Sequence, residues 1–245
     1  EISLVISCTE DISSEKKATG MFCSTAIFRA MDKVKAVLPI PGRAATIIKS
    51  LFCQPDVSLH AMFMLLALSK NVFYYDKFAR KADWTSRWDI KAWDVAEKNL
   101  LVIGYGRIGS RLVKRALAFD MNVFVYDPYV DDADIKKSGA ECVDNFKNIL
   151  SKMDAVSLHC PKTKETTDMF SSEEFNEMKN TAFLINCARG GIVNEKALYD
   201  ALINKKIRAA GLDVYDDEPS TPSNPLFGLD NILLSPHIAG VTQEA

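Results

Sequence analysis

Residues 99–109 read NLLVIGYGRIG, and this stretch decides the fold because it joins an apolar run to a glycine-rich turn and a helical pattern. Apolar side chains recur at helical spacing from 107 to 119. In a GxGxxG turn of this kind, Gly104 makes the tight turn, Gly106 lets the backbone approach a pyrophosphate, and Gly109 lets the helix pack against the strand. The helix N-terminus also presents N–H groups and a partial positive charge to the anion. The stretch therefore predicts a dinucleotide-binding strand–turn–helix, with a bare glycine turn as the alternative.

The next apolar run, 123–126, ends at Asp127, which lies 18 residues after Gly109. A carboxylate at this position accepts hydrogen bonds from both hydroxyls of an adenosine ribose and repels a 2′-phosphate. The three residues that follow, Pro128-Tyr129-Val130, include no arginine. We therefore expect the cofactor to be NAD rather than NADP.

Short apolar runs alternate with helical patterns from residue 99 to the end of the chain. Alternation of this length indicates right-handed βαβ crossovers and a parallel sheet covered on both faces. The expected fold class is α/β, with a doubly wound parallel sheet of the Rossmann type. We expect strands at 100–103, 123–126, 155–158, 182–185, 209–214 and 232–234, and helices at 107–119, at 145–153, after a capping sequence at Ser171 and after a cap at Asn194.

The first part of the chain is less regular. A strand is expected at 2–6, a helix at 19–31 and a long helix at 55–81, rich in Met, Leu and Phe. Trp84, Trp88 and Trp93 then fall in a polar stretch that has the character of a linker or lid. We place a domain boundary near residue 94, with the dinucleotide-binding domain at 94–241.

The composition excludes several classes of protein. The 245 residues carry a formal net charge of −2 and are 48% hydrophobic, which excludes a disordered charged tail and a nucleic-acid binder that works by bulk charge. The longest apolar run, 61–68, is far shorter than the ~20 residues that span a bilayer, and no signal peptide is visible, so we expect a cytoplasmic protein. The cysteines form no CxxC pair, which indicates reduced thiols and neither a disulfide framework nor a metal site. They are Cys8, Cys23, Cys53, Cys142, Cys160 and Cys187.

Several short segments between residues 99 and 245 carry a family resemblance. They are Gly104-Tyr105-Gly106-Arg107-Ile108-Gly109, His159-Cys160-Pro161, Asn186-Cys187-Ala188-Arg189-Gly190-Gly191, Gly211-Leu212-Asp213-Val214, Asp217-Glu218-Pro219 and Ser235-Pro236-His237-Ile238-Ala239-Gly240. Together and in this order, they resemble the D-isomer-specific 2-hydroxy acid dehydrogenases, which include D-3-phosphoglycerate dehydrogenase and glyoxylate/hydroxypyruvate reductase. The resemblance is much weaker before residue 99.

Three of these residues suit acid–base chemistry on a hydroxy acid. His237 can exchange the hydroxyl proton because an imidazole titrates near neutral pH. Glu218 would pair with the imidazolium and hold its tautomer, and Arg189 can grip a substrate carboxylate through two hydrogen bonds. The resemblance implies that Arg189, Glu218 and His237 are the family's catalytic triad. Taken singly, each would more often be a surface charge or a structural residue.

The resemblance also implies further contacts to the cofactor. Asp213 is either a nicotinamide-side contact or a buried carboxylate at a strand end, and both interpretations stay open. Cys160 and Cys187 have no neighbouring base in the sequence, so we do not expect thiol catalysis. His60 lies in an apolar helix and is expected in the core or at an interface. The implied cofactor contacts are Gly104, Gly106, Arg107, Ile108, Gly109, Asp127, His159, Cys160, Pro161, Thr166, Cys187, Ala188, Arg189, Asp213, His237 and Gly240.

The chain departs from the family in its substrate domain. The resemblance implies a smaller flavodoxin-like substrate domain at 1–93 and a return helix that starts at 242–245. Here the glycine-rich substrate loop reads VLPIPGRAAT at 37–46 and looks shortened, and the family's Ser-Val-Ala-Glu becomes Asp56-Val57-Ser58-Leu59. Either residues of this domain are absent from the sequence, which we favour, or the domain is truly shortened and catalysis is impaired. Trp84, Trp88 and Trp93 lie where the family's reductases place a loop that contacts the substrate or the dimer partner. Packing of these side chains beneath the expected 55–81 crossover helix is an equal alternative.

Two functional hypotheses follow, each from a different class. The first is an NAD-dependent oxidoreductase that acts on a small D-2-hydroxy acid or 2-oxo acid, as a homodimer formed through the 55–81 helix. The second is an NAD(H)-sensing binding protein that resembles the co-repressors built on this fold. A dehydrogenase for formate or phosphite is a third, weaker alternative. The identity of the hydroxy acid and the direction of the reaction are left open.

Overall fold

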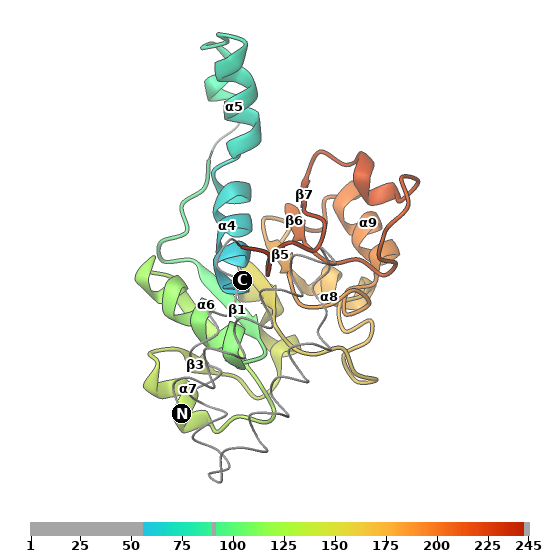
Figure 1. Cartoon of the computed structure of the whole chain (residues 1–245). Coiled ribbons are helices and arrows are strands. Elements are labelled where there is room, and N and C mark those ends of the chain that lie inside the picture. Colours follow the sequence, from blue (N-terminus) through green and yellow to red (C-terminus); the bar gives the residue numbers. More distant parts are fainter. Residues whose placement is uncertain (1–55, 90–91, 243–245) are drawn as a thin grey trace, which may run out of the picture. The chain divides into compact units, whose positions relative to one another are not determined.

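The strands form a single parallel sheet in which the order along the sheet differs from the order along the chain. The computed structural model describes residues 56–89 and 92–242. The seven strands lie in the order β3-β2-β1-β4-β5-β6-β7, and every neighbouring pair is parallel (Figure 1). The direction of strand addition reverses between β1 and β4, and ligands of doubly wound sheets collect at such a switch point. The strands are β1 (Asn99–Ile103), β2 (Asn122–Tyr126), β3 (Glu141–Cys142), β4 (Ala155–Leu158), β5 (Phe183–Asn186), β6 (Ala209–Leu212) and β7 (Ile232–Leu234).

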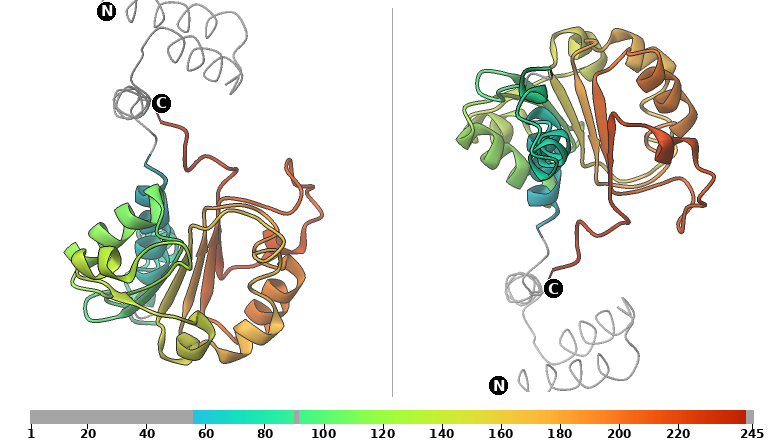
Figure 2. Two further views of the ribbon diagram at one scale, coloured as in Figure 1. Left: turned by 90° about the horizontal axis from the view of Figure 1, so that it is seen from below. Right: turned by 90° about the horizontal axis from the view of Figure 1, so that it is seen from above.

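Helices cover both faces of the sheet, as Figure 2 shows. One hydrophobic cluster packs α4 (Val57–Ser69), α6 (Arg107–Ala118) and α7 (Asp132–Lys137) against one face. The other cluster packs α8 (Ser172–Glu177), α9 (Glu195–Ile203) and the 3₁₀ helices η2 (Phe146–Lys152) and η3 (Pro225–Gly228) against the opposite face. All residues of β4, β5 and β6 are buried. This double burial explains why these strands are continuous apolar runs rather than alternating patterns.

The sequence signals at helix starts correspond to observed caps. The Asn194 side chain accepts a hydrogen bond from the Ala197 N–H at 2.9 Å, which caps α9. Ser171 and Glu174 form a capping box at α8, in which the Glu174 carboxylate accepts the Ser171 N–H at 3.0 Å. Both predicted helix starts are confirmed, because a side chain there satisfies N–H groups that the helix cannot pair.

The prediction of one helix over 55–81 is wrong. The structure has α4, then a break at Asn71, then α5 (Val72–Arg80), with a 60° bend between the two helices. Asn71 has a φ of +50°, a left-handed conformation that asparagine tolerates better than most residues and that ends α4. No single helix in the described ranges is long and apolar enough to cross a membrane. The bent pair of α4 and α5 reaches that length and apolar composition only when the two helices are counted together.

Smaller differences occur at other elements. The helix expected at 145–153 is the 3₁₀ helix η2, and α7 and β3 were not predicted because their residues are mostly charged and their runs short. The elements expected at 2–6 and 19–31 lie outside the described residues.

Helix α4 belongs to the same compact unit as the sheet. The described residues from Asp56 to Val241 belong to one compact unit, and the domain boundary expected near residue 94 stays a prediction. Physically, α4 packs against β5, β6 and α6, and a Cβ at Gly211 would lie 3.1 Å from the Met64 side chain. The Trp93 ring packs in a tilted arrangement on Phe183, with 5.1 Å between the ring centroids, whereas Trp84 and Trp88 are largely exposed.

Candidate active site

The three glycines of the turn after β1 meet different surroundings. Gly104 has a φ of +95°, and a Cβ there would lie 2.7 Å from the His159 carbonyl carbon. A Cβ at Gly109 would lie 1.9 Å from the Gly104 carbonyl oxygen, so α6 packs against the turn too closely for a side chain. At Gly106, by contrast, no heavy atom of the described residues lies within 4 Å of that position. Two glycines are needed for packing, and the third leaves open space at the N-terminus of α6, where an anion binds readily.

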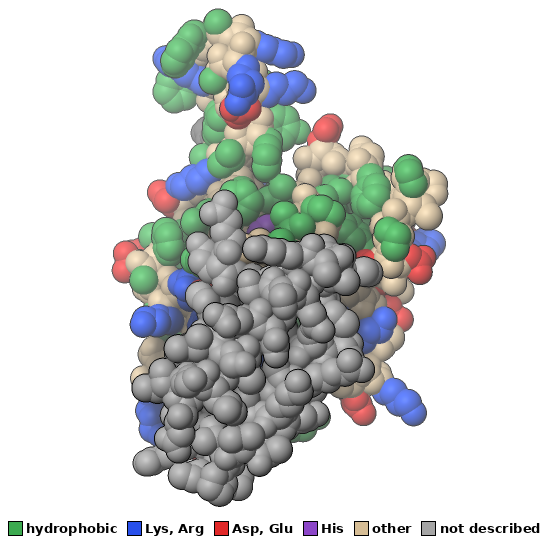
Figure 3. All heavy atoms as spheres, viewed as in Figure 1, with side chains coloured by type: hydrophobic (Ala, Val, Ile, Leu, Met, Phe, Trp, Pro, Cys, Tyr) green, Lys and Arg blue, Asp and Glu red, His purple; other side chains and the backbone are tan. Residues whose placement is uncertain are grey.

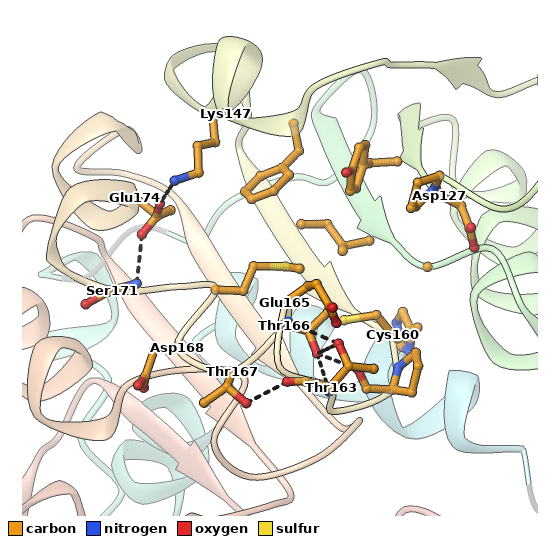
Figure 4. A pocket seen from close by; sticks show the side chains of 18 of the residues that line it. Asp127, Lys147, Cys160, Thr163, Glu165, Thr166, Thr167, Asp168, Ser171 and Glu174 are labelled. Carbon is orange, nitrogen blue, oxygen red and sulfur yellow. Dashed lines mark hydrogen bonds and ion pairs between the residues drawn. The ribbon is translucent and has the colours of Figure 1, made fainter.

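Asp127 lies directly after β2, beside this turn. One carboxylate oxygen accepts the Tyr105 N–H at 2.7 Å, and the other accepts the Tyr129 N–H at 2.9 Å. A carboxylate has about four acceptor sites, so each oxygen keeps one for a ribose hydroxyl. The backbone bonds orient the group toward the pocket beside the glycine turn (Figure 4).

The pocket has a volume of about 810 Å³ and lies at the carboxyl ends of β1, β2 and β4. Its apolar floor includes Ile103, Tyr126, Phe146 and Met169. Gly104 and Gly106 line it, and Figure 4 shows Asp127 and the loop after β4, with Cys160 and Thr166, around it. This combination of an apolar slot, a carboxylate and a glycine turn fits the adenosine and pyrophosphate of a dinucleotide.

The loop after β4 contributes the predicted residues His159, Cys160, Pro161 and Thr166. The Thr166 hydroxyl donates to the Pro161 carbonyl at 2.7 Å and accepts the Thr163 N–H at 2.7 Å, which closes the loop. His159 Nε2 pairs with the Ser157 hydroxyl at 2.8 Å, and its buried Nδ1 has no hydrogen-bond partner among the described residues. Burial lowers the pKa of His159 to about 4, so this ring is neutral at physiological pH.

The two cysteines of this region are not activated as nucleophiles. Burial raises the pKa of Cys160 to about 11, and burial followed by the charge of Asp213 raises the pKa of Cys187 further. The thiolate is the reactive form of cysteine, so both side chains are unreactive thiols at neutral pH.

The predicted triad residues come together at the carboxyl ends of β5, β6 and β7. His237 Nδ1 lies 2.5 Å from Glu218 Oε2, and Glu218 Oε1 accepts the Tyr215 N–H at 2.9 Å. Burial opposes ionisation of Glu218. The hydrogen bonds from His237 and Tyr215, with the charges of His237 and Arg189, outweigh burial and lower the pKa of this carboxyl. Glu218 is therefore an anion that faces one ring nitrogen and leaves Nε2 for another partner.

Arg189 is exposed in the loop after β5. Its Nη1 donates to the Ala188 carbonyl at 2.6 Å, while the Asn186 side chain donates to the Arg189 carbonyl at 3.0 Å. A Cβ at the next residue, Gly190, would lie 1.6 Å from the Tyr215 carbonyl oxygen, so this loop packs directly against the loop that holds Glu218. The guanidinium is turned back onto the Ala188 carbonyl, and its charge acts on Glu218 from a loop that is held in place.

Asp213 is fully buried at the end of β6, and hydrogen bonds within the chain reach both carboxylate oxygens. Oδ1 accepts the Ile238 N–H at 2.9 Å, and Oδ2 accepts the Ala239 N–H at 2.8 Å, directly before Gly240. This is the environment of a buried strand-end carboxylate, and the nicotinamide contact stays a prediction.

The sequence analysis missed two residues of this region. The Tyr215 N–H binds Glu218, and the Tyr215 hydroxyl donates to the Ser235 carbonyl at 3.0 Å. The hydroxyl of Ser235 donates to Asp213 at 2.5 Å. No local pattern reveals these roles, because each depends on loops that are distant in the sequence.

Comparison with known proteins identifies the family. The family model described as D-isomer specific 2-hydroxyacid dehydrogenase, NAD binding domain, matches residues 62–239. The chain is 40% identical over 186 residues to the D-3-phosphoglycerate dehydrogenase of Archaeoglobus fulgidus, covering 76% of this chain and 35% of that protein. It is 34% identical over 219 residues to the hydroxypyruvate reductase of Thermotoga maritima, covering 89% of this chain and 67% of the relative.

Solved structures agree with this result. The D-lactate dehydrogenase of Aquifex aeolicus, complexed with NAD and lactic acid, is 35% identical and matches with a TM-score of 0.70 over 77% of this chain and 61% of that one. The chain spans about a third of the length of the D-3-phosphoglycerate dehydrogenases that it matches. The chain belongs to the D-isomer-specific 2-hydroxyacid dehydrogenase family and carries its NAD-binding domain.

Proposed function

We propose that this protein is an NAD-dependent oxidoreductase that interconverts a small D-2-hydroxy acid and its 2-oxo acid. The observation that carries the proposal is the His237–Glu218 pair, 2.5 Å apart, beside the exposed Arg189. The glycine turn and Asp127 lie at the same edge of the parallel sheet. An acid–base group, a carboxylate-binding cation and a dinucleotide pocket are the parts that this reaction requires.

The geometry assigns a task to each side chain. Arg189 would bind the substrate carboxylate through two N–H groups and orient the adjacent carbonyl. His237 Nδ1–H would donate to Glu218, which fixes the tautomer and stabilises the imidazolium. In the reducing direction, His237 Nε2 would give its proton to the carbonyl oxygen, and in the oxidising direction it would accept the hydroxyl proton. The glycine turn and Asp127 would hold the dinucleotide, which would supply or accept the hydride when bound.

Asp127 supports a preference for NAD. Its carboxylate is oriented by two backbone N–H groups, and an anionic 2′-phosphate next to it would be repelled. The exposed Tyr129 follows it, and no arginine stands among the three residues after Asp127.

A substrate panel tests the proposal. The protein is mixed with NADH and, separately, with glyoxylate, hydroxypyruvate, pyruvate and 3-phosphohydroxypyruvate, and NADH absorbance is followed. Loss of absorbance with one of these acids supports the oxidoreductase. NADH binding without turnover of any 2-oxo acid contradicts it and favours the NAD(H)-sensing alternative. Formate and phosphite, added with NAD, test the third alternative.

We also infer that the protein forms a homodimer through α4 and α5. Leu59 and Phe63 on α4 are more than half exposed, as is Phe73 on α5, and hydrophobic side chains gather over α4 in Figure 3. A two-fold axis beside these helices would let the same patch cover its own copy. Light scattering after size-exclusion chromatography should give the mass of two chains, and Phe63→Glu should give one. A monomeric wild-type protein would contradict this assignment.

A further inference from the structure

A partly buried chain of polar groups connects helix α4 to the loop that carries His237. His60, on α4, places Nε2 at 2.9 Å from the Ser235 hydroxyl oxygen. That hydroxyl lies 2.5 Å from Asp213 Oδ1, while His60 Nε2 itself is 3.7 Å from the same carboxylate oxygen. Residues 60 and 235 are far apart in the sequence, so this contact ties together two elements that local spacing does not connect.

The direction of each hydrogen bond follows from the chemistry of the groups. The Ser235 hydroxyl donates to Asp213 Oδ1 at 2.5 Å, and the same oxygen accepts the Ile238 N–H at 2.9 Å. The single proton of the Ser235 hydroxyl is thus used toward Asp213. The remaining lone pair of this hydroxyl can only accept, so His60 must carry its proton on Nε2 and donate it.

This direction excludes a hydrolase-type triad. A serine nucleophile needs a histidine nitrogen that accepts the serine proton and a carboxylate on the other ring nitrogen. Here the histidine nitrogen that faces Ser235 is the donor, and the carboxylate binds the serine. The chain of groups holds a loop in place and does not activate a hydroxyl.

The loop that it holds contains the strained residue of the site. His237 has a φ of +53°, a left-handed conformation that is uncommon for a residue with a Cβ. Asp213 binds the hydroxyl of Ser235, before this residue, and the N–H groups of Ile238 and Ala239, after it. His237 is therefore held from both sides through one buried carboxylate.

We propose that His60 is a positioning residue for His237, acting from α4 through the Ser235 hydroxyl and the Asp213 carboxylate. The catalytic part of this inference rests on the proposed function, whereas the effect on the loop does not. Without the Nε2–H donor, the Ser235 oxygen and the nearby Asp213 oxygen lose a polar partner in a buried setting. The loop then samples conformations in which His237 no longer faces the substrate in the required orientation.

Two substitutions in the full chain separate positioning from packing. His60→Leu removes the donor and keeps an apolar side chain, while His60→Gln places an amide N–H the same number of bonds from Cα as Nε2. Leu66→Met is the matched control, because Leu66 is a partly buried residue of the same helix that packs against the hydrophobic cluster and lies outside the proposed dimer patch. The readouts are amide hydrogen exchange by NMR, the dissociation constant of NADH, and kcat and KM for the 2-oxo acid that is turned over.

With His60→Leu, hydrogen exchange at the Ile238 and Ala239 amides should become about tenfold faster, which is the change expected when one hydrogen bond is lost. The β1 amides should be unchanged, kcat should fall about tenfold, and NADH affinity should stay within about twofold. In His60→Gln both amide exchange and kcat should return most of the way to the wild-type values, and Leu66→Met should change neither. Unchanged exchange at these two amides in His60→Leu, an unchanged kcat, or a His60→Gln variant as impaired as His60→Leu would each overturn the proposal. If the wild type turns over none of the acids, the proposed function fails, while the exchange measurement still decides the role of His60 in the loop.

Discussion

At the scale of single residues, the environment of each ionisable group determines its role. Glu218 is partly buried yet has a lowered pKa, because His237, the Tyr215 N–H and the charge of Arg189 all favour its anion. His159, buried without a charged partner, has its pKa lowered to about 4 and stays neutral. His237, with an anionic partner, is thus suited to exchange a proton, and His159 is not. Both residues follow strands at the same edge of the sheet.

The lowered pKa of Glu218 predicts a dependence of stability on pH. The folded protein binds the Glu218 proton more weakly than the unfolded chain, whose pKa is near the ordinary value of 4.5. The stabilisation is therefore present above that pH and is lost as the pH falls through the lower, folded-state value. Glu218→Gln should cost stability at pH ~6, and the difference from wild type should narrow toward pH ~3. Urea unfolding at both pH values measures this. Glu177→Gln, exposed on α8, is the control, and a pH-independent difference for Glu218→Gln would contradict the argument.

Asp127 predicts the cofactor preference. Asp127→Ala removes both the acceptor for the ribose hydroxyls and the charge that repels a 2′-phosphate. We expect the ratio of NADPH to NADH affinity to rise by roughly 10- to 100-fold, the effect of a charged hydrogen-bonding group. Fluorescence titration with each dinucleotide measures the ratio. The matched control is Asp131→Ala. Asp131 carries the carboxylate that caps α7 and is not among the residues that line the pocket. An unchanged ratio in Asp127→Ala would remove the ribose assignment.

At the scale of elements, the strand–turn–helix at β1 and α6 combines packing and binding in one short segment. Gly109 is required by the contact between α6 and the turn, whereas the position of a Cβ at Gly106 is open. The same residue type therefore serves the fold at Gly109 and leaves open space at Gly106, where we propose that the cofactor binds.

This difference gives a matched pair of variants. Gly109→Ala should destabilise the protein by about 1–3 kcal/mol, because its Cβ meets backbone that must move. Gly106→Ala should unfold at nearly the wild-type temperature but bind NADH at least about tenfold more weakly, because the methyl group occupies the approach to the pyrophosphate. Thermal unfolding and NADH titration of both proteins measure the two effects. Equal loss of stability in both variants would contradict these separate roles.

The elements that sequence patterns predicted are those specified by local chemistry. The β1 turn, the Asn194 cap and the Ser171 capping box all depend on residues within a few positions of each other. The break at Asn71 escaped prediction because apolar spacing continues across it while the backbone turns left-handed. The contact of His60 with Ser235 and the burial of Asp213 arise only when α4 packs on β5 and β6. No spacing along the chain contains that information.

At the scale of the whole domain, the order of the strands brings the chemistry together. Because all strands are parallel, the glycine turn, Asp127, Arg189, Glu218 and His237 follow different strands yet lie at one edge of the sheet. The reversal of strand order between β1 and β4 opens this edge for a dinucleotide. Family membership agrees with this arrangement, and the substrate remains the part that the panel must identify.

The most direct test of the central claim is the stereochemistry of the product. The protein is incubated with NADH and the 2-oxo acid that it consumes, and the product is analysed by chiral chromatography for the wild type and for His237→Gln. The proposed function predicts a D-2-hydroxy acid from the wild type. It also predicts a rate about 10²- to 10⁴-fold lower for His237→Gln, with NADH binding nearly unchanged. An L-hydroxy acid, no hydroxy acid with any substrate in the panel, or a His237→Gln variant with nearly full activity would contradict it.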